Sequence, residues 1–195
     1  MYQPFDIGKW FRILPPGAEA PEDGRINLVM ARGAFGSGEH ETTASCLETL
    51  ETLPELAGAR LLDVGSGTAI LAIGALLLGA AEAVAVDISP DAVASARRNC
   101  EANGVAQRVR HLTGSLESVP GKNFDLIVAN IYGDLLLDFA DGMVRRVRPG
   151  GLLLLSGILW EYNFEVREAF ERRGCTVLKN RMLEQFSTVL LQKKE

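Results

Sequence analysis

Two acidic residues and two glycines in the first half of the chain have the spacing of a nucleoside-binding site. Residues 63–67 read Asp-Val-Gly-Ser-Gly and close a short apolar run, so Gly65 and Gly67 allow a sharp turn and a close approach to a ligand. Asp87 ends the next apolar run about 20 residues further on, where a carboxylate can accept hydrogen bonds from ribose hydroxyls. Together with Asp63, these residue types predict a nucleoside-containing ligand at the carboxyl ends of neighbouring strands.

A plain structural turn is the competing interpretation, because Gly-x-Gly after a strand is common. The dinucleotide fingerprint needs a third glycine where Ile70 stands, which weakens NAD binding but leaves it open. The phosphate-binding pattern G-x-x-x-x-G-K-[ST] does not occur in the sequence. Ser89 and Pro90 start a helix directly after Asp87, and this register favours the nucleoside site.

A second glycine-rich segment, GAFGSGEHETT, lies upstream at residues 33–43. A helix is predicted to begin at its end, and free N–H groups at a helix N-terminus suit a carboxylate such as that of methionine. Thr42 and Thr43 can hydrogen-bond there too. His40 is a candidate general base, but we favour a loop histidine that holds the backbone, since a base needs demonstrated geometry. Asn130 closes another predicted strand, with a turn residue as the alternative.

Apolar runs alternate with helical patterns from residue 41 onward, which indicates βαβ units and a mostly parallel sheet with helices on both faces. Only residues 179–185 separate the last two runs, and a parallel crossover needs about a dozen residues. We therefore predict a Rossmann-like, seven-stranded α/β sheet with an antiparallel last strand. The expected strands are 60–64, 83–87, 108–112, 124–129, 152–155, 175–178 and 186–191. The expected helices are 41–53, 69–78, one from Ser89 to Gly104, one with Leu136, Ala140, Met143 and Val147 on one face, and 164–173.

Other local patterns are turns, core or extended pieces. Residues 149–151, Pro-Gly-Gly, are expected as a turn, and the leucine runs at 76–78 and 135–137 as core. Residues 1–32 are expected as an N-terminal arm with short extended pieces at 10–14 and 26–30. Residues 33–195 are expected to form the main domain.

Composition limits the classes of function. The chain has 195 residues, 47% of them hydrophobic, enough for one domain with a real core. A net charge of -5 disfavours a broad duplex-binding surface, so direct nucleic-acid binding is not expected. Three scattered cysteines and two histidines argue against a disulfide framework and a metal site.

The start lacks a signal peptide, and the apolar stretch 70–86 is short for a membrane span. We expect a cytoplasmic protein without a membrane partner.

Two of these segments resemble known families. Residues 63–67 resemble the first motif of class I S-adenosylmethionine-dependent methyltransferases, and the antiparallel last strand resembles their sheet. Residues 33–43 resemble the AFGTGxHxTT signature of the PrmA-type protein methyltransferases. That family trimethylates amino groups of ribosomal protein L11, and a related branch methylates lysines of an electron-transfer flavoprotein subunit. Residues 71–75 and 128–131 continue the match, which spans roughly residues 33 to 191.

The resemblance implies S-adenosylmethionine as the cofactor. Gly65 and Gly67 would then border its methionine moiety, Asp87 would hold the ribose, and Asn130 would be the catalytic residue beside the incoming amine. The implied cofactor-binding residues are Phe35, Gly38, Thr43, Asp63, Gly65, Gly67, Asp87 and Asn130. Residues 132–134, Tyr-Gly-Asp, depart from the Leu-Ala usual in the family, which bears on substrate preference.

The expected reaction is methyl transfer to an amine of a protein substrate, a lysine or an N-terminal amine, with a ribosomal protein among the candidates. The family's substrate-recognition domain would precede the signature, where only about 30 residues stand. A small-molecule acceptor is the first alternative. A non-enzymatic nucleoside-binding module or an NAD-dependent protein is the second. The oligomeric state is left open.

Overall fold

A seven-stranded sheet forms the centre of the computed structural model, which describes residues 2–31 and 38–195. The strand order is β6-β5-β4-β7-β8-β10-β9, in which β6 to β8 run parallel and β10 runs antiparallel to both neighbours. The predicted sheet with an antiparallel last strand is confirmed. The bounds are β4 (Arg60–Val64), β5 (Glu82–Asp87), β6 (Val109–Thr113), β7 (Phe124–Asn130), β8 (Val147–Leu159), β9 (Cys175–Met182) and β10 (Phe186–Lys193).

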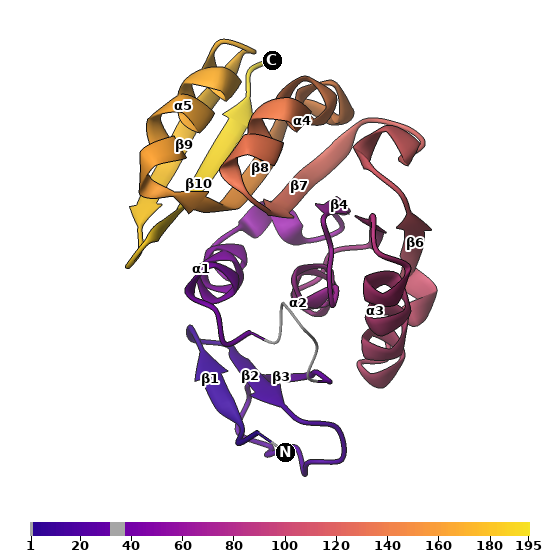
Figure 1. Ribbon diagram of the computed structural model, residues 1–195. Helices are drawn as coiled ribbons and strands as arrows, with labels where there is room; N and C mark the ends of the chain where they lie inside the picture. The colour runs from indigo at the N-terminus through magenta and orange to yellow at the C-terminus, as the bar shows by residue number, and fades with distance from the viewer. Residues whose placement is uncertain (1, 32–37) are drawn as a thin grey trace.

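Helices cover both faces of this sheet (Figure 1). One face carries α1 (Glu41–Leu50), α2 (Ile70–Leu77) and α3 (Pro90–Ala102), and the other carries α4 (Gly133–Arg146) and α5 (Trp160–Glu171). Side chains alternate between the two layers: Leu61 belongs to the core under α1 and α2, and its neighbour Leu62 to the core under α4 and α5. Within the described residues, no helix is long and apolar enough to span a bilayer.

Helix boundaries follow local chemistry. Ser89 accepts a hydrogen bond from the Ala92 amide (3.3 Å) and Pro90 is the first residue of α3, as the sequence predicts. Short 3-10 turns lie at Pro54–Leu56, Ala106–Arg108 and Leu116–Ser118. The first of these explains why α1 ends at Leu50 rather than at residue 53: the chain must already turn before Pro54.

The predicted turn at 149–151 is instead an irregular part of β8. The strand begins at Val147, a residue expected on the helix before it, because Pro149 cannot continue that helix. Val147 pairs with Phe124, and regular pairing resumes only at Leu152 with Leu126, so the residues between them bulge.

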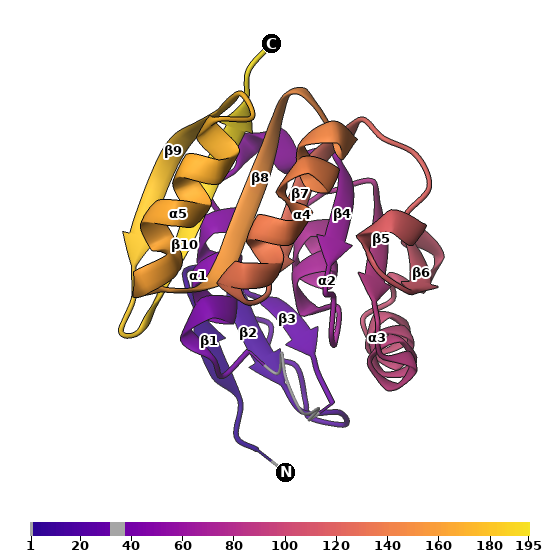
Figure 2. The ribbon, with the colours of Figure 1, turned by 45° about the horizontal axis from the view of Figure 1, so that its top comes forward.

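Residues 2–31 form a second, three-stranded sheet (Figure 2). Its strands are β1 (Phe5–Ile7), β2 (Phe11–Leu14) and β3 (Ile26–Val29), with β1 antiparallel and β3 parallel to β2. The extended pieces expected at 10–14 and 26–30 are therefore strands. Phe11, Leu28 and Met30 are fully buried in the same core as α1 and α2.

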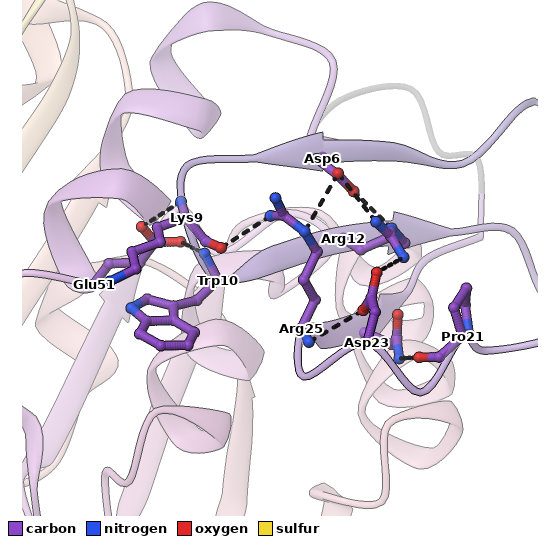
Figure 3. Close-up of polar contacts among 9 residues, drawn as sticks. Asp6, Lys9, Trp10, Arg12, Pro21, Asp23, Arg25 and Glu51 are labelled. Carbon is purple, nitrogen blue, oxygen red and sulfur yellow. Dashed lines mark hydrogen bonds and ion pairs between the residues drawn. The ribbon is translucent and has the colours of Figure 1, made fainter.

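The residues that cap the C-terminal ends of α1 and α3 hold this small sheet in place. The Asn103 side chain accepts from the Val29 amide (2.8 Å) and donates to the Val29 carbonyl (2.7 Å), as a neighbouring strand would. The Glu51 carboxylate accepts from the amides of Lys9 (2.9 Å) and Trp10 (2.7 Å) in the turn between β1 and β2 (Figure 3). Gly8 has a φ of +58°, which favours glycine, and a Cβ there would lie 2.6 Å from a Glu51 oxygen, so a larger residue would displace this carboxylate.

We predict that Glu51→Ala loosens the β1–β2 turn by removing both acceptors. The expected loss in the free energy of unfolding is about 1 kcal/mol, because both bonds are exposed to water. Faster hydrogen exchange of the Lys9 and Trp10 amides would show the effect locally. Glu55→Ala, an exposed substitution nearby, is the control. Unchanged protection of the two amides would contradict the assigned role.

Candidate active site

A cavity of about 370 Å³ opens at the carboxyl edge of the central sheet, within the size range of small-molecule sites. Each surrounding strand contributes a residue near the end that reaches this edge. These residues are Gly65 after β4, Asp87 of β5, Ser115 after β6, Asn130 of β7, Gly157 of β8 and Phe186 of β10. Ligands of open α/β sheets bind at this edge, because the loops that leave the strands gather there.

The Asp87 carboxylate joins the two turns that the sequence singles out. One oxygen accepts from the Gly67 amide (2.8 Å) and the other from the Ser89 amide (2.9 Å). Two ionic oxygens have about four acceptor sites, so capacity for two hydroxyl donors is left at the cavity wall. Asp87 is therefore oriented by the protein and still able to bind a ribose-like diol.

Asn130 and Thr43, which lie 87 positions apart in the sequence, are in contact in the structure. The Asn130 side-chain amide donates to the Thr43 hydroxyl at 3.3 Å. Asn130 lines the cavity, whereas Thr43 is only 2% exposed and lies behind it. Thr43 thus orients the Asn130 amide, and its placement gives it an indirect role at the cavity.

His40 holds the start of α1. Its Nδ1 lies 2.7 Å from the Thr42 hydroxyl and accepts from the Thr42 amide at 3.3 Å, which caps the helix. Its ring packs edge-on against Phe186, with centroids 5.1 Å apart. These contacts support the interpretation of His40 as a residue that holds the backbone.

Ile131, directly after Asn130, is enclosed by two glycines in the left-handed region. Gly157 has a φ of +79°, and a Cβ there would lie 2.5 Å from the Ile131 carbonyl oxygen. Gly65 has a φ of +67°, and its Cβ would collide with Cγ2 of Ile131. The Ile131 amide donates to the Ser156 carbonyl at 3.2 Å. The two missing side chains therefore let β7 end close to β4 and β8, which fixes the backbone that carries Asn130.

Asp63 lies beneath the glycine turn and does not line the cavity. It is 2% exposed and accepts from the Ala72 amide at 3.2 Å. Burial raises the pKa of this carboxyl from 3.8 to about 7; the Ala72 bond opposes that shift and the charge of Asp87 adds to it.

The remaining residues implied by the resemblance are placed as follows. Gly67 contacts the cavity wall through Asp87. Gly38 has a φ of +91°, and a Cβ there would lie 3.2 to 3.4 Å from Ile7, Ile13 and Ile70, so it borders the core near the small sheet and does not line the cavity. Phe35 lies outside the described residues. All eight cofactor assignments stay predictions, although Gly65, Asp87 and Asn130 lie together at the cavity wall.

Sequence reasoning missed several residues of this wall. Ile88 and Leu116 give it apolar sides, and Leu135, expected in the core, is 38% exposed and lines it. Ile88 was the easiest to find, because it directly follows Asp87. Gly157 and Phe186 carried no motif, and only the pairing of β8 with β10 brings them to the cavity.

The strand order and the helices on both faces define a Rossmann-like fold of the kind found in methyltransferases. An RNA methyltransferase from Salinibacter ruber in complex with S-adenosyl-L-homocysteine superimposes with a TM-score of 0.63 over 77% of this chain and 92% of that one. At 19% sequence identity this likeness concerns the fold alone.

The match to a protein family covers nearly the whole chain. The family described as ribosomal protein L11 methyltransferase (PrmA) matches residues 1–194, and this chain belongs to it. The match extends beyond the span of about 33 to 191 expected from the motifs, so the N-terminal sheet is part of what the family shares.

Individual relatives agree. A ribosomal protein L11 methyltransferase of Azotobacter vinelandii is 47% identical over 91% of this chain and 60% of its own length. A homologue of the same name from Pseudomonas paraeruginosa is 46% identical over 87% of this chain and 57% of its own length. The chain thus spans less than two thirds of these relatives. The crystal structure of a ribosomal protein L11 methylase from Lactobacillus delbrueckii subsp. bulgaricus has a TM-score of 0.89 and 26% identity, covering 100% of this chain and 99% of that one.

We predict that stability depends on the proton of Asp63. The folded protein binds this proton more tightly than the unfolded chain does, so the free energy of unfolding falls as pH rises from about 4 to about 7. The slope from this group approaches about 1.4 kcal/mol per pH unit. Urea unfolding of the wild type and Asp63→Asn across this range measures it as the difference between the curves. Parallel curves would show that Asp63 titrates normally.

We further predict that Gly157→Ala costs about 2 kcal/mol or more of unfolding free energy, because the added Cβ meets peptide atoms as well as an unfavourable φ. Gly150→Ala is the matched control in the same strand: its φ is +69°, but the Cβ meets only the flexible end of Arg148. The control should lose about 1 kcal/mol. Equal losses in denaturant unfolding would argue against the enclosure of Ile131.

Proposed function

We propose that this chain is an S-adenosylmethionine-dependent methyltransferase that methylates an amine nitrogen of a protein, with ribosomal protein L11 as the first candidate substrate. Asn130 carries the proposal: it ends β7 at the cavity wall, its amide is oriented by Thr43, and the following peptide is held between Gly65 and Gly157. The chain's membership of the PrmA family supports the same reaction class.

The residues of the cavity fit the proposed cofactor. Asp87 has acceptor capacity left for a ribose diol, while Ile88 and Leu116 offer apolar walls suited to an adenine ring. Gly65 leaves the strand end without a side chain, so a ligand can approach the backbone. When bound, the sulfonium group supplies a methyl group that is already activated for in-line displacement.

The protein's own contribution is to position a neutral amine. A lysine amine has a pKa of about 10.4 in water, so it must lose a proton before it can attack. Ile131, Tyr132 and Phe186 give the cavity apolar walls near Asn130, and desolvation there lowers the pKa of an amine. With its amide N–H groups directed at Thr43, Asn130 can accept a hydrogen bond from the amine through its side-chain oxygen and align the nitrogen.

A small-molecule acceptor is the alternative that keeps this chemistry. The mouth of the cavity beside Tyr132, which is 61% exposed, favours a protein acceptor over a small molecule. The cytoplasm is the proposed location, because the three thiols are free and buried, as in a reducing compartment.

We predict that Asn130→Ala reduces methyl transfer to L11 by at least about a hundredfold while S-adenosylhomocysteine still binds, since alignment is lost and most of the cofactor wall remains. Asp87→Asn should weaken S-adenosylhomocysteine binding by about tenfold or more, as its ionic acceptors are lost. Calorimetry and transfer of a labelled methyl group measure the two effects.

Asp91→Asn is the control for Asp87, being an exposed acid in the first turn of the next helix. NAD is titrated in parallel. Binding of NAD without S-adenosylhomocysteine would overturn the proposal, and so would full turnover by Asn130→Ala.

A further inference from the structure

The mouth of the cavity has an exposed apolar rim. Tyr132 and Leu135 at the start of α4 line the cavity and are 61% and 38% exposed. Trp160 at the start of α5 is 52% exposed, and its indole N–H donates to the carbonyl of Phe186, another lining residue, at 3.0 Å. Phe164 lies one turn further along α5 and is 67% exposed. Single exposed apolar residues are ordinary, but several around one opening indicate a surface for a partner.

The two helix starts form one continuous part of this rim. A Cβ at Gly133 would lie 2.8 Å from Cβ of Tyr162, so the first turns of α4 and α5 are in direct contact. The apolar rim, defined as Tyr132, Leu135, Trp160 and Phe164, therefore extends from the cavity along α5.

The segments that line the cavity carry charge of a single sign, and Arg181 near the end of β9, at the same edge, is paired with Glu48. Six segments reach this edge and supply most of the cavity wall: residues 38–41, 87–91, 114–117, 130–135, 157–161 and 184–187. They contain neither Lys nor Arg, a statement that does not extend to residues 32–37. Their acidic residues are Glu39, Glu41, Asp87, Asp91, Glu117, Asp134, Glu161 and Glu184.

Some of these acids hold backbone amides, and the positive N-terminal ends of the helices offset part of the remaining negative charge. Glu41 accepts from the amides of Glu184 and Gln185, and Asp87 holds its two turns. Each of the five α-helices in residues 2–31 and 38–195 begins at this edge and contributes about half a positive charge there. Eight carboxylates against about two and a half positive charges still leave the edge clearly negative.

The opposite edge of the sheet carries both signs, with Arg60 paired to Glu82 and Arg148 to Asp125. Arg60 begins β4, Arg145 and Arg146 end α4, and Lys193 ends β10. Unpaired basic residues thus gather away from the cavity edge, so a ligand that approaches the cavity meets mainly carboxylates.

From this rim and its charge we infer that the cavity mouth docks a positively charged, lysine-bearing protein segment whose apolar side chains rest on Tyr132, Trp160 and Phe164. The inference rests on the proposed function and specifies its substrate. Carboxylates beside an apolar surface attract a cationic segment and accelerate its encounter, while the same field repels a phosphate backbone. A basic protein segment is therefore favoured over RNA as the methyl acceptor.

The test compares three fluorescent probes on the whole chain in the presence of S-adenosylhomocysteine. Two are peptides of equal length that share a lysine at the centre and Leu and Ile at the same positions. The residues around the central lysine include Lys and Arg in one peptide and Asp and Glu in the other. The third is a single-stranded RNA of similar length. Fluorescence anisotropy gives each Kd at ionic strengths of about 0.01 M and about 0.15 M, where the Debye length falls from about 30 Å to about 8 Å.

We expect the cationic peptide to bind at least tenfold more tightly than the other two, and its affinity to fall with salt. The triple variant Asp134→Asn, Glu161→Gln, Glu184→Gln should weaken its binding by about tenfold. A control with the same change in net charge, Glu55→Gln, Glu101→Gln, Glu171→Gln, alters exposed acids outside the six segments and should bind as the wild type does. Phe164→Ala should weaken binding severalfold, and Trp10→Ala, at an exposed indole in the N-terminal sheet, should not.

Three outcomes would overturn the inference: equal binding of both peptides, tighter binding of the RNA, or equal effects of the two triple variants. The wild type and each variant are first titrated with S-adenosylhomocysteine. Absence of that binding in the wild type would refute the proposed function itself, whereas intact cofactor binding without peptide preference would refute only the docking surface.

Discussion

The close approach of three strand ends around Ile131 is the constraint on which the site depends. β7 can end beside β4 and β8 only because Gly65 and Gly157 carry no side chains where Ile131 lies. Both glycines adopt positive φ values, so the backbone is sharply turned on each side of one peptide. A side chain at Gly157 would have to displace main-chain atoms, which close-packed interiors resist. Asn130 is thus positioned mainly by main-chain packing, and one hydrogen bond to Thr43 completes its orientation.

From this centre the restraints extend outward through polar side chains that hold backbone amides. Asp87 ties the β4 turn to the start of α3, Glu41 holds the turn before β10, and Glu51 holds the turn between β1 and β2. A carboxylate that accepts two amides fixes a turn at low entropic cost to the chain, because the acceptor belongs to a helix or strand or, for Glu51, caps one. The N-terminal sheet is held in the same way and shares the core of α1 and α2, so residues 2–31 are packed as part of the domain.

The sequence predicted the regular elements well and the junctions poorly. Strands such as 60–64 were found because buried parallel strands are continuous apolar runs between turn residues, and the antiparallel last strand followed from a connection too short for a crossover. The start of β8 was missed, because Pro149 and Gly150 signal a turn whether the chain reverses or only bulges. Gly38 illustrates the limit for the site: its glycine-rich segment indicated a ligand loop, yet a side chain at this position would meet core isoleucines of three different elements. Such contacts depend on tertiary packing that no local pattern encodes.

Net charge illustrates a different limit, because a sum hides where the charges lie. The value of -5 disfavoured a broad nucleic-acid surface, but it is equally compatible with a basic patch at the cavity. The arrangement of the helices and strands decides which charges lie at the cavity. In a parallel α/β sheet the helices run opposite to the strands, so their N-termini gather at the carboxyl edge, where acidic first-turn residues such as Asp134 and Glu161 are favoured. The fold therefore carries acids to the very edge where it forms its cavity. Glu184 lies in a strand connection outside any helix and adds to the same sign, so helix stabilisation alone does not account for the field that an incoming substrate meets.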